Sequence, residues 1–159
     1  MKKAGLLLAI LLSILGCAKE YAESPQARSL LAKDPDAAGA ILAVREYNRN
    51  IVAAYAKNDP TPVRDVTDDG EFRKLAHMIE GMQAQNLRLE STLQSLLVEK
   101  VDRWGPDNVL VTTVEKWRYR RVNIETGQVV KPYTEIEYHM NYTMIRPKGR
   151  WVLFRLTPA

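Results

Sequence analysis

The chain contains a single cysteine and only two histidines, and these shortages exclude several kinds of site. One cysteine cannot form a disulfide within the chain. His77 and His139 lie far apart in the sequence with no acidic motif beside them, so we expect no metal site. The sequence also lacks an HExxH motif, a GxSxG motif, a phosphate-binding glycine loop and an EF-hand pattern. We therefore expect no cofactor and no catalytic residues that a motif could identify.

A hydrophobic N-terminal run that ends at Cys17 is the clearest positive signal. Two lysines precede residues 4–16, which are mostly leucine and isoleucine, and this pattern is typical of a secretory signal peptide. The segment Ile14-Leu15-Gly16-Cys17 resembles the lipobox of bacterial lipoproteins, with an aliphatic residue three positions before the cysteine and a small residue directly before it. The resemblance implies that residues 1–16 are a lipoprotein signal peptide and that Cys17 is lipidated.

Lipidation would hold the protein to a membrane of the bacterial cell envelope. Each buried CH₂ of an acyl chain contributes about 0.8 kcal/mol, so two or more chains give a stable anchor. Ala18 and Lys19 follow Cys17 with no aspartate, and by the same resemblance this implies the periplasmic side of the outer membrane. Lipid on the only thiol would also exclude thiolate catalysis and cysteine-ligated metals.

Two other interpretations of the N-terminal run remain open. It fits an ordinary signal peptide followed by a chance cysteine. It also fits an uncleaved membrane helix, although such a span needs about 20 apolar residues. Lys19 and Glu20 end the run before that length is reached.

The charge balance gives no reason to expect a nucleic-acid partner. The formal net charge is +4, and removal of Lys2 and Lys3 with a cleaved leader would lower it to +2. A charge this small would attract a phosphate backbone only weakly. The remaining residues 17–159 are enough for one domain with its own hydrophobic core.

The first part of this remaining chain is predicted to be a tether. Residues 17–34 are polar, with one proline and several small side chains, so we expect the lipidated cysteine and a flexible linker there, with a short helix near residues 26–32. We expect the folded domain to span residues 35–159. No internal repeat is visible in it.

The first half of the domain has the signals of three helices. Asp34-Pro35 predicts the start of the first, because an N-cap residue precedes proline at the first helical position. A mostly apolar stripe with steps of three or four residues then runs to Tyr55, and the polar Asn48 lies on it; its members are Ile41, Val44, Asn48, Ile51 and Tyr55. Asp59-Pro60 predicts a second, short helix to Val66. The spacing of Asp68 and Glu71 predicts a third, to about residue 86.

The second half has the two-residue period of strands. Alternation predicts strands over residues 109–120, 135–146 and 151–156, joined by a hairpin near Gly127 and a turn at residues 147–149. Residues 89–104 fit both a helix and a strand, and their β-branched residues favour a strand. Helices followed by an antiparallel sheet of about four strands indicate an α+β fold, with one sheet face packed on the helices.

This layout resembles the nuclear-transport-factor-2-like superfamily, and within it the IMS-type domain of chloroplast division proteins and bacterial envelope proteins. The resemblance rests on alternating residues in three strands: 111–119, 138–144 and 149–153. It implies a cone-shaped domain in which a curved sheet and helices surround a pocket. Members of the superfamily include isomerases, dehydratases, ligand-binding proteins and association domains, so the fold alone does not choose a function.

A candidate pocket follows from the strand alternation. Glu115, Trp117 and Tyr119 share one face of a strand. We expect Tyr138 and Tyr142 on the same side of the neighbouring strand, and Trp151 beside them. An aromatic wall with one carboxylate suits a small apolar or amphipathic ligand. The alternative is that the rings fill the core and that Glu115 only accepts hydrogen bonds there.

Lys116, Arg118 and Arg120 fall on the opposite face of that strand and form a candidate basic surface. Arg121 extends this basic stretch in the sequence. It could contact anionic lipid headgroups or an acidic partner. It could also be an ordinary solvated face, with Glu135 and Glu137 as cross-strand neighbours.

Two functions are consistent with these observations. The first is a lipid-anchored, non-enzymatic module that binds an envelope protein or a small ligand, or that forms a homodimer through its sheet. The second is an isomerase-type or dehydratase-type enzyme acting on a small hydrophobic substrate. The enzyme needs an open cavity with an acid such as Glu115 at its base, facing a tyrosine.

Overall fold

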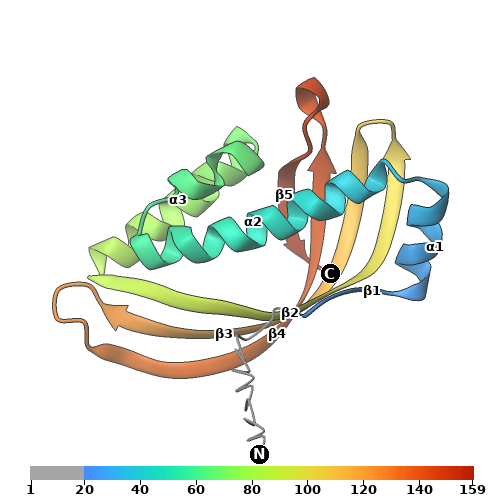
Figure 1. The fold of residues 1–159 in the computed structure, drawn as a ribbon. Coiled ribbons are helices and arrows are strands. Elements are labelled where there is room, and N and C mark those ends of the chain that lie inside the picture. The colour runs from blue at the N-terminus through green and yellow to red at the C-terminus, as the bar shows by residue number, and fades with distance from the viewer. Residues whose placement is uncertain (1–19) are drawn as a thin grey trace, which may run out of the picture.

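The computed structural model describes residues 20–159, so the leader and Cys17 lie outside the described residues. Helices pack on the concave side of a strongly bent sheet, and α2 crosses the sheet with α3 beside it (Figure 1). The helical elements are α1 (Pro25–Lys33), α2 (Ala37–Lys57), the short helix η1 (Thr61–Val66), α3 (Asp69–Ala84) and the turn η2 (Pro147–Gly149). The strands are β1 (Glu20–Glu23), β2 (Leu87–Gly105), β3 (Asn108–Asn123), β4 (Val129–Ile145) and β5 (Val152–Pro158).

The sheet has the order β1-β2-β3-β4-β5, and all neighbours are antiparallel except β1 and β2. The predicted α+β fold with helices ahead of a curved sheet is confirmed. Residues 89–104, whose sequence fitted both a helix and a strand, lie in strand β2. The sheet has one strand more than expected, because residues 20–23 pair with β2.

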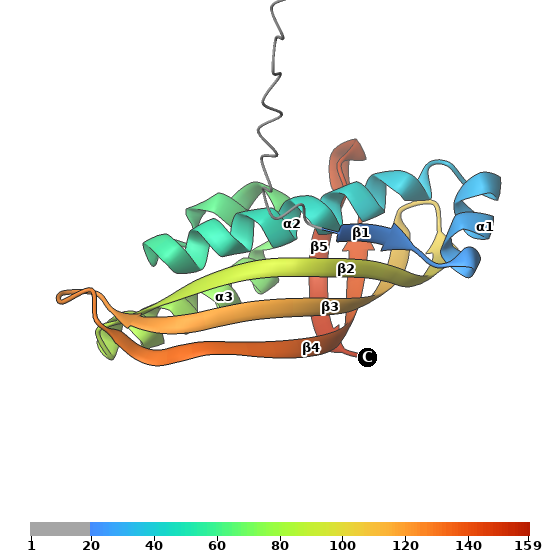
Figure 2. The same ribbon diagram turned by 60° about the horizontal axis from the view of Figure 1, so that its bottom comes forward.

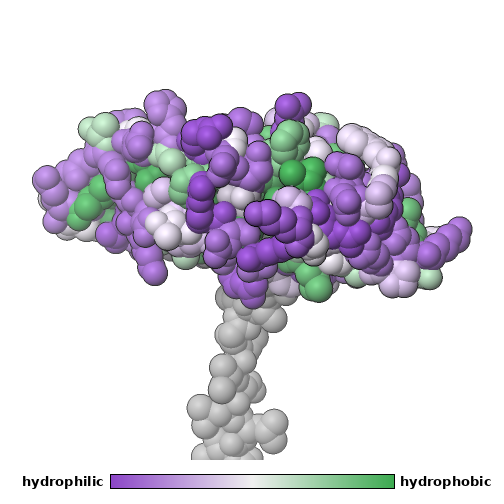
Figure 3. Space-filling view, turned by 90° about the horizontal axis from the view of Figure 1, so that it is seen from above, coloured by the Kyte–Doolittle hydropathy of each residue, from purple (hydrophilic) through white to green (hydrophobic). Residues whose placement is uncertain are grey.

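Strand alternation decides which side chains face the helices. Along β3 every second residue from Val109 to Trp117 is buried, and Lys116 and Arg118, on either side of Trp117, are exposed. In Figure 2 the outer face of β2, β3 and β4 lies open, with no described helix over it. Seen from the helix side, the surface is mostly hydrophilic, with hydrophobic residues in separate patches (Figure 3).

The long strands bend because their pairing is interrupted. The register between β2 and β3 shifts at Leu93/Ser95, at Val98/Lys100 and at Arg103/Gly105. An extra residue on one strand increases local twist and bends the sheet. The bend lets α2 pack on the buried half of β2 and β3 and leaves space between the helices and the other end of the strands.

The predicted tether is wrong from Glu20 onward, although the short helix expected near residues 26–32 is present as α1. Ser24 caps α1 by accepting a hydrogen bond from the amide of Ala27 at 3.1 Å, and Pro25 occupies the first turn. The amide of Ser24 also donates to the carbonyl of Val98 at 2.8 Å. Ala27 is fully buried. Residues 20–33 are therefore part of the folded domain, and two residues, Ala18 and Lys19, separate Cys17 from the first strand.

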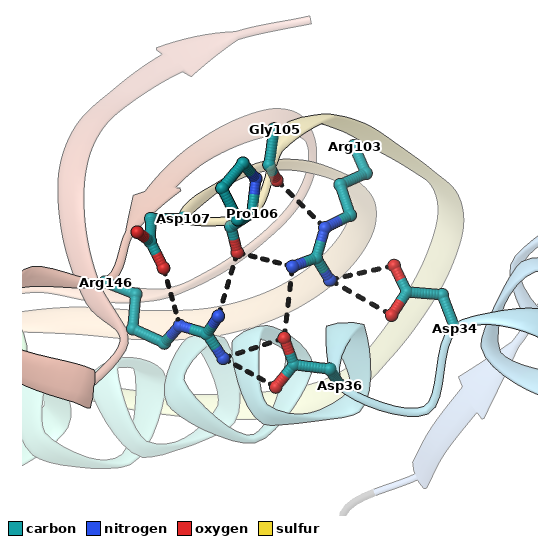
Figure 4. Close-up of polar contacts among 7 residues, drawn as sticks. All are labelled: Asp34, Asp36, Arg103, Gly105, Pro106, Asp107 and Arg146. Carbon is teal, nitrogen blue, oxygen red and sulfur yellow. Dashed lines mark hydrogen bonds and ion pairs between the residues drawn. The ribbon is translucent and has the colours of Figure 1, made fainter.

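The first long helix begins at Ala37 rather than at Pro35. Asp34 does not cap it, because both carboxylate oxygens of Asp34 accept from the guanidinium of Arg103, at 3.0 and 2.8 Å. Asp36 accepts from Arg103 at 3.1 Å and from Arg146 at 2.6 and 2.7 Å (Figure 4). This cluster joins the α1–α2 connection to the turns after β2 and β4.

The turn between β2 and β3 completes this cluster. The carbonyl of Pro106 accepts from both guanidinium groups, with the Arg146 contact at 2.9 Å, and Arg146 also donates to Asp107 at 2.9 Å (Figure 4). The hydrogen bond from Arg103, followed by the contact with Arg146, lowers the pKa of Asp36 below its usual value. Asp36 therefore stays ionised to a lower pH than an isolated aspartate does.

Trp151 packs at this end of the molecule, on the first turn of α2. It is 8% exposed, and the guanidinium of Arg146 lies 4.9 Å from the centre of its ring. A Cβ atom at Gly39 would lie 2.9 Å from Trp151 Cδ1, so only glycine lets the helix approach the indole this closely.

None of the helices within residues 20–159 is both long and apolar enough to span a membrane.

Two helix glycines give a matched test of this close contact. Gly39→Ala places a methyl group against the buried Trp151 ring, and overpacking of this kind costs about 1–3 kcal/mol. Gly81→Ala in α3 meets nothing within 4 Å, so it gains helix propensity of up to about 1 kcal/mol. We expect urea unfolding to show lower stability for the first variant and unchanged or higher stability for the second. Equal stability of the two variants would contradict the contact.

Candidate ligand pocket

A cavity of about 650 Å³ lies between the helices and the concave face of the sheet, and it opens to solvent. Volumes of this size hold small ligands. Its apolar lining includes three methionines, which are flexible side chains that adapt to differently shaped ligands. The helices contribute Tyr47, Asn48, Ile51, Tyr55, Met78, Gly81, Met82 and Gln85. The strands contribute Leu89, Ser91, Glu115, Trp117, Tyr119, Arg121, Tyr138, Met140, Tyr142, Leu156 and Pro158.

Glu115 lies at the buried end of this cavity and is 2% exposed. Its Oε1 atom accepts hydrogen bonds from the hydroxyl of Tyr142 at 2.6 Å and from that of Thr113 at 2.8 Å. Its Oε2 atom accepts from the indole Nε1 of Trp117 at 2.8 Å. A carboxylate has about four acceptor positions, so three are occupied by neutral donors and one, on Oε2, is left.

Asn48 connects this carboxylate to α2. Its side-chain amide donates to the hydroxyl of Tyr142 at 3.0 Å and to the carbonyl of Val44 at 3.2 Å. Tyr142 packs edge to face on Tyr47, with ring centres 6.2 Å apart. The polar residue on the apolar stripe of the helix is therefore a buried link between helix and sheet.

Burial sets the ionisation of the tyrosines in the cavity. It raises the pKa of Tyr55 to about 12 and raises the pKa of Tyr142 well above its usual value, with the nearby Glu115 charge acting in the same direction. Burial also raises the pKa of Tyr47 and of Tyr138. At neutral pH these side chains are neutral phenols that donate or accept hydrogen bonds.

Several polar groups in the lining have no partner within residues 20–159. The Oγ atom of Ser91 is buried and forms no hydrogen bond there. The hydroxyls of Tyr47, Tyr55, Tyr119 and Tyr138 also form no hydrogen bond with the described residues. A bound ligand with a polar atom could satisfy Ser91, because a buried hydroxyl without a partner carries an energetic cost.

Five of the six predicted pocket residues line the cavity together: Glu115, Trp117, Tyr119, Tyr138 and Tyr142. Trp151 does not, since it packs on Gly39 in α2. Arg121, which the sequence grouped with the basic stretch, lines the cavity and is exposed. The register of β3 and β4 shifts on both sides of Arg121.

Lys116, Arg118 and Arg120 lie on the outer face of the sheet, where acidic neighbours balance their charge. Arg120 donates to Glu90 at 2.7 Å. Arg118 pairs in register with Glu135, and its guanidinium lies 3.9 Å from the centre of the Tyr133 ring. Lys116 pairs in register with Glu137. The outer face therefore carries mixed charge rather than a basic stripe.

The helix residues of the cavity were missed in the sequence because an amphipathic stripe does not distinguish a filled core from a cavity wall. Tyr47, Ile51 and Tyr55 belong to that stripe or border it. The one available signal was Asn48, a polar residue on an apolar stripe. Among residues 20–159, no three His, Cys, Asp or Glu side chains gather as ligands for a metal.

The hydroxyl of Tyr142 supports Glu115, and this support can be measured. Tyr142→Phe removes a donor from a buried carboxylate and a partner from Asn48, so we expect a loss of about 1–3 kcal/mol of unfolding free energy. Tyr47→Phe removes a hydroxyl with no partner in residues 20–159, and we expect a change within about 0.5 kcal/mol. Urea unfolding of both variants compares them. Losses of the same size would show that Tyr142 does not support Glu115.

No family model matches the sequence, and no curated protein matches it. Among solved structures, the chain is similar to the intermembrane space region of the chloroplast protein ARC6, with a TM-score of 0.68 and 14% identity over 77% of this chain and 95% of that chain. It is also similar to a ketosteroid isomerase-like protein from Erwinia carotovora atroseptica, with a TM-score of 0.51 and 16% identity over 77% of this chain and 94% of that one. At these identities the likeness shows the fold alone, and the chain has the nuclear-transport-factor-2-like α+β fold.

Proposed function

We propose that this protein is a non-enzymatic binding module of the bacterial cell envelope, anchored by lipid on Cys17, that holds a small amphipathic ligand in its cone pocket. The observation that carries the proposal is the open cavity of about 650 Å³ with an aromatic and aliphatic lining and few polar groups. Such a lining favours an apolar body, and the unpartnered hydroxyls favour a ligand that also has polar atoms.

The hydrogen bonds of Glu115 favour binding over catalysis. A general base must reach the proton that it removes. Three donors hold Glu115 in place and occupy most of its acceptor positions. The side chain is suited to fix the orientation of a ligand more than to move toward it.

An enzyme of isomerase or dehydratase type is the second candidate. It is favoured by the specific contact between Glu115 and Tyr142, a carboxylate and a phenol 2.6 Å apart in an open cavity. A structural neighbour is described as ketosteroid isomerase-like. Incubation of the protein with the molecule recovered from it separates the two functions. A binding module would leave this molecule unchanged, and an enzyme would convert it.

The short distance between Cys17 and β1 limits how far the domain could lie from a membrane that holds the lipid. Glu20 follows Cys17 by three positions, and three steps along a chain span at most about 10 Å. A lipid on Cys17 would therefore keep the domain close to the membrane surface, where amphipathic ligands concentrate. The outer sheet face would remain available for an envelope partner or for a second copy of the chain.

Native mass spectrometry of protein purified from membranes tests the pocket. We expect a retained small molecule in the unaltered protein. Ile51→Trp fills the cavity from α2 and should reduce its occupancy about tenfold, since the added ring competes for the same space. Leu42→Trp is the matched control, because Leu42 lies on the same helix, is 62% exposed and does not line the cavity. Equal retention by the two variants, or no retained molecule at all, would contradict the proposed pocket.

Metabolic labelling with a palmitate analogue tests the anchor. We expect incorporation into the unaltered chain and loss of the label in Cys17→Ser, because the resemblance assigns the lipid to this thiol. Membrane fractionation should show the same variant released from the membrane. Equal labelling of both proteins would refute lipidation at Cys17.

A further inference from the structure

Glu115 is a buried carboxylate with no counterion among the described residues. Within residues 20–159 only two carboxylates are buried, Glu71 and Glu115. Glu71 pairs with Lys74 at 2.8 Å. None of the ion pairs formed by residues 20–159 includes Glu115. Buried charges in proteins are generally paired, so a negative charge held by neutral donors alone is an unusual feature at the end of a cavity.

The neutral donors stabilise this charge but do not cancel it. Thr113, Tyr142 and Trp117 each supply one hydrogen bond, and no residue of the described range 20–159 occupies the remaining acceptor position on Oε2. A cationic group entering the cavity would find an acceptor and an unbalanced negative charge at the same place.

The walls around this charge also favour a cation. Six aromatic side chains line the same cavity, and the face of each ring carries partial negative charge that attracts ammonium groups. Alkyl and methionine side chains complete the lining and suit an apolar body. The six are Tyr47, Tyr55, Trp117, Tyr119, Tyr138 and Tyr142.

Arg121 also lines the cavity, and its positive charge would repel a cation. Its exposure to solvent weakens this effect relative to that of the buried Glu115. Arg121 is an exposed residue of the cavity lining, whereas Glu115 is 2% exposed. The same pair of charges interacts about fourfold more strongly at the effective dielectric of a protein than in bulk water. Salt further screens an exposed charge. The buried carboxylate therefore sets the charge preference of the cavity, and Arg121 reduces it only in part.

We infer that the ligand of this cavity is an organic cation with an apolar body, an alkylammonium or arylalkylammonium compound whose charged nitrogen lies at Glu115. This inference rests on the proposed function, because it names the chemical class of the ligand that the same pocket would hold. The nitrogen would contact the free position on Oε2 and the surrounding ring faces. The alkyl or aryl body would extend along the aliphatic lining toward the opening.

Three probes with eight carbon atoms each test the inference: octylamine, octanol and octanoate. At neutral pH the amine is protonated, the alcohol is neutral and the acid is ionised. Calorimetric titration of the purified protein should give affinities for octylamine about tenfold higher than for octanol, with octanoate weakest. Equal affinities would overturn the inference and leave the proposed pocket intact. A preference for octanoate would overturn it in favour of Arg121, and no binding of any probe would overturn both.

Two variants test whether the buried charge of Glu115 causes the preference for octylamine. Glu115→Gln keeps the shape and removes the charge, so the affinities for octylamine and octanol should come within about twofold of each other. Should this variant fail to fold, Arg121→Gln decides, because the exposed residue can change without disturbing the core. We expect it to strengthen octylamine binding about twofold and to weaken octanoate binding. Weaker octylamine binding in Arg121→Gln would contradict the inference.

Discussion

The hydrogen bonds around Glu115 join the principal helix to the sheet and determine the character of the cavity. Asn48 on α2 contacts Tyr142 on β4, and Tyr142 contacts Glu115 on β3. A carboxylate can be buried only if donors replace its water, and here Thr113, Trp117 and Tyr142 do so. Packing of α2 on the sheet thus depends on a polar contact in an otherwise apolar interior, and the same contact places a negative charge where a ligand would lie.

The cavity exists because the strands are longer than the helices that cover them and because they bend. Bulges in β2 redirect the strand, α2 and α3 lie over the concave side, and a cavity remains between them and the sheet. At the other end of the molecule the space closes: Gly39 lets the helix contact Trp151, and Asp36 joins Arg103 and Arg146. One end of the cone is therefore packed and ion-paired, and the other end holds the open cavity. The separation explains how a single small domain can combine a stable core with an open pocket.

Much of the fold could be predicted because its signals are local. The period of two along residues 109–120 reports a strand with one buried face, and the Asp68 spacing reports a helix start that the structure has at Asp69. The start of the first long helix was mispredicted because Asp34 can either cap a helix or form an ion pair. Its partner Arg103 lies in β2, far along the chain, so the sequence around Asp34 does not reveal the ion pair. β1 was missed because four residues carry too little pattern to reveal their pairing with β2.

Alternation in the sequence by itself determined which strand residues face the helices, and so it grouped Glu115, Trp117 and Tyr119, since side chains of a strand point to one face at every second position. The basic residues of the outer face follow from the same rule. Only the tertiary structure decided that this face borders an open cavity, that Trp151 lies outside it and that Arg121 lies at its lining. Those facts depend on the bending of β2 and on how closely α2 approaches the sheet. Both arise from contacts between residues far apart in the chain, which no local pattern records.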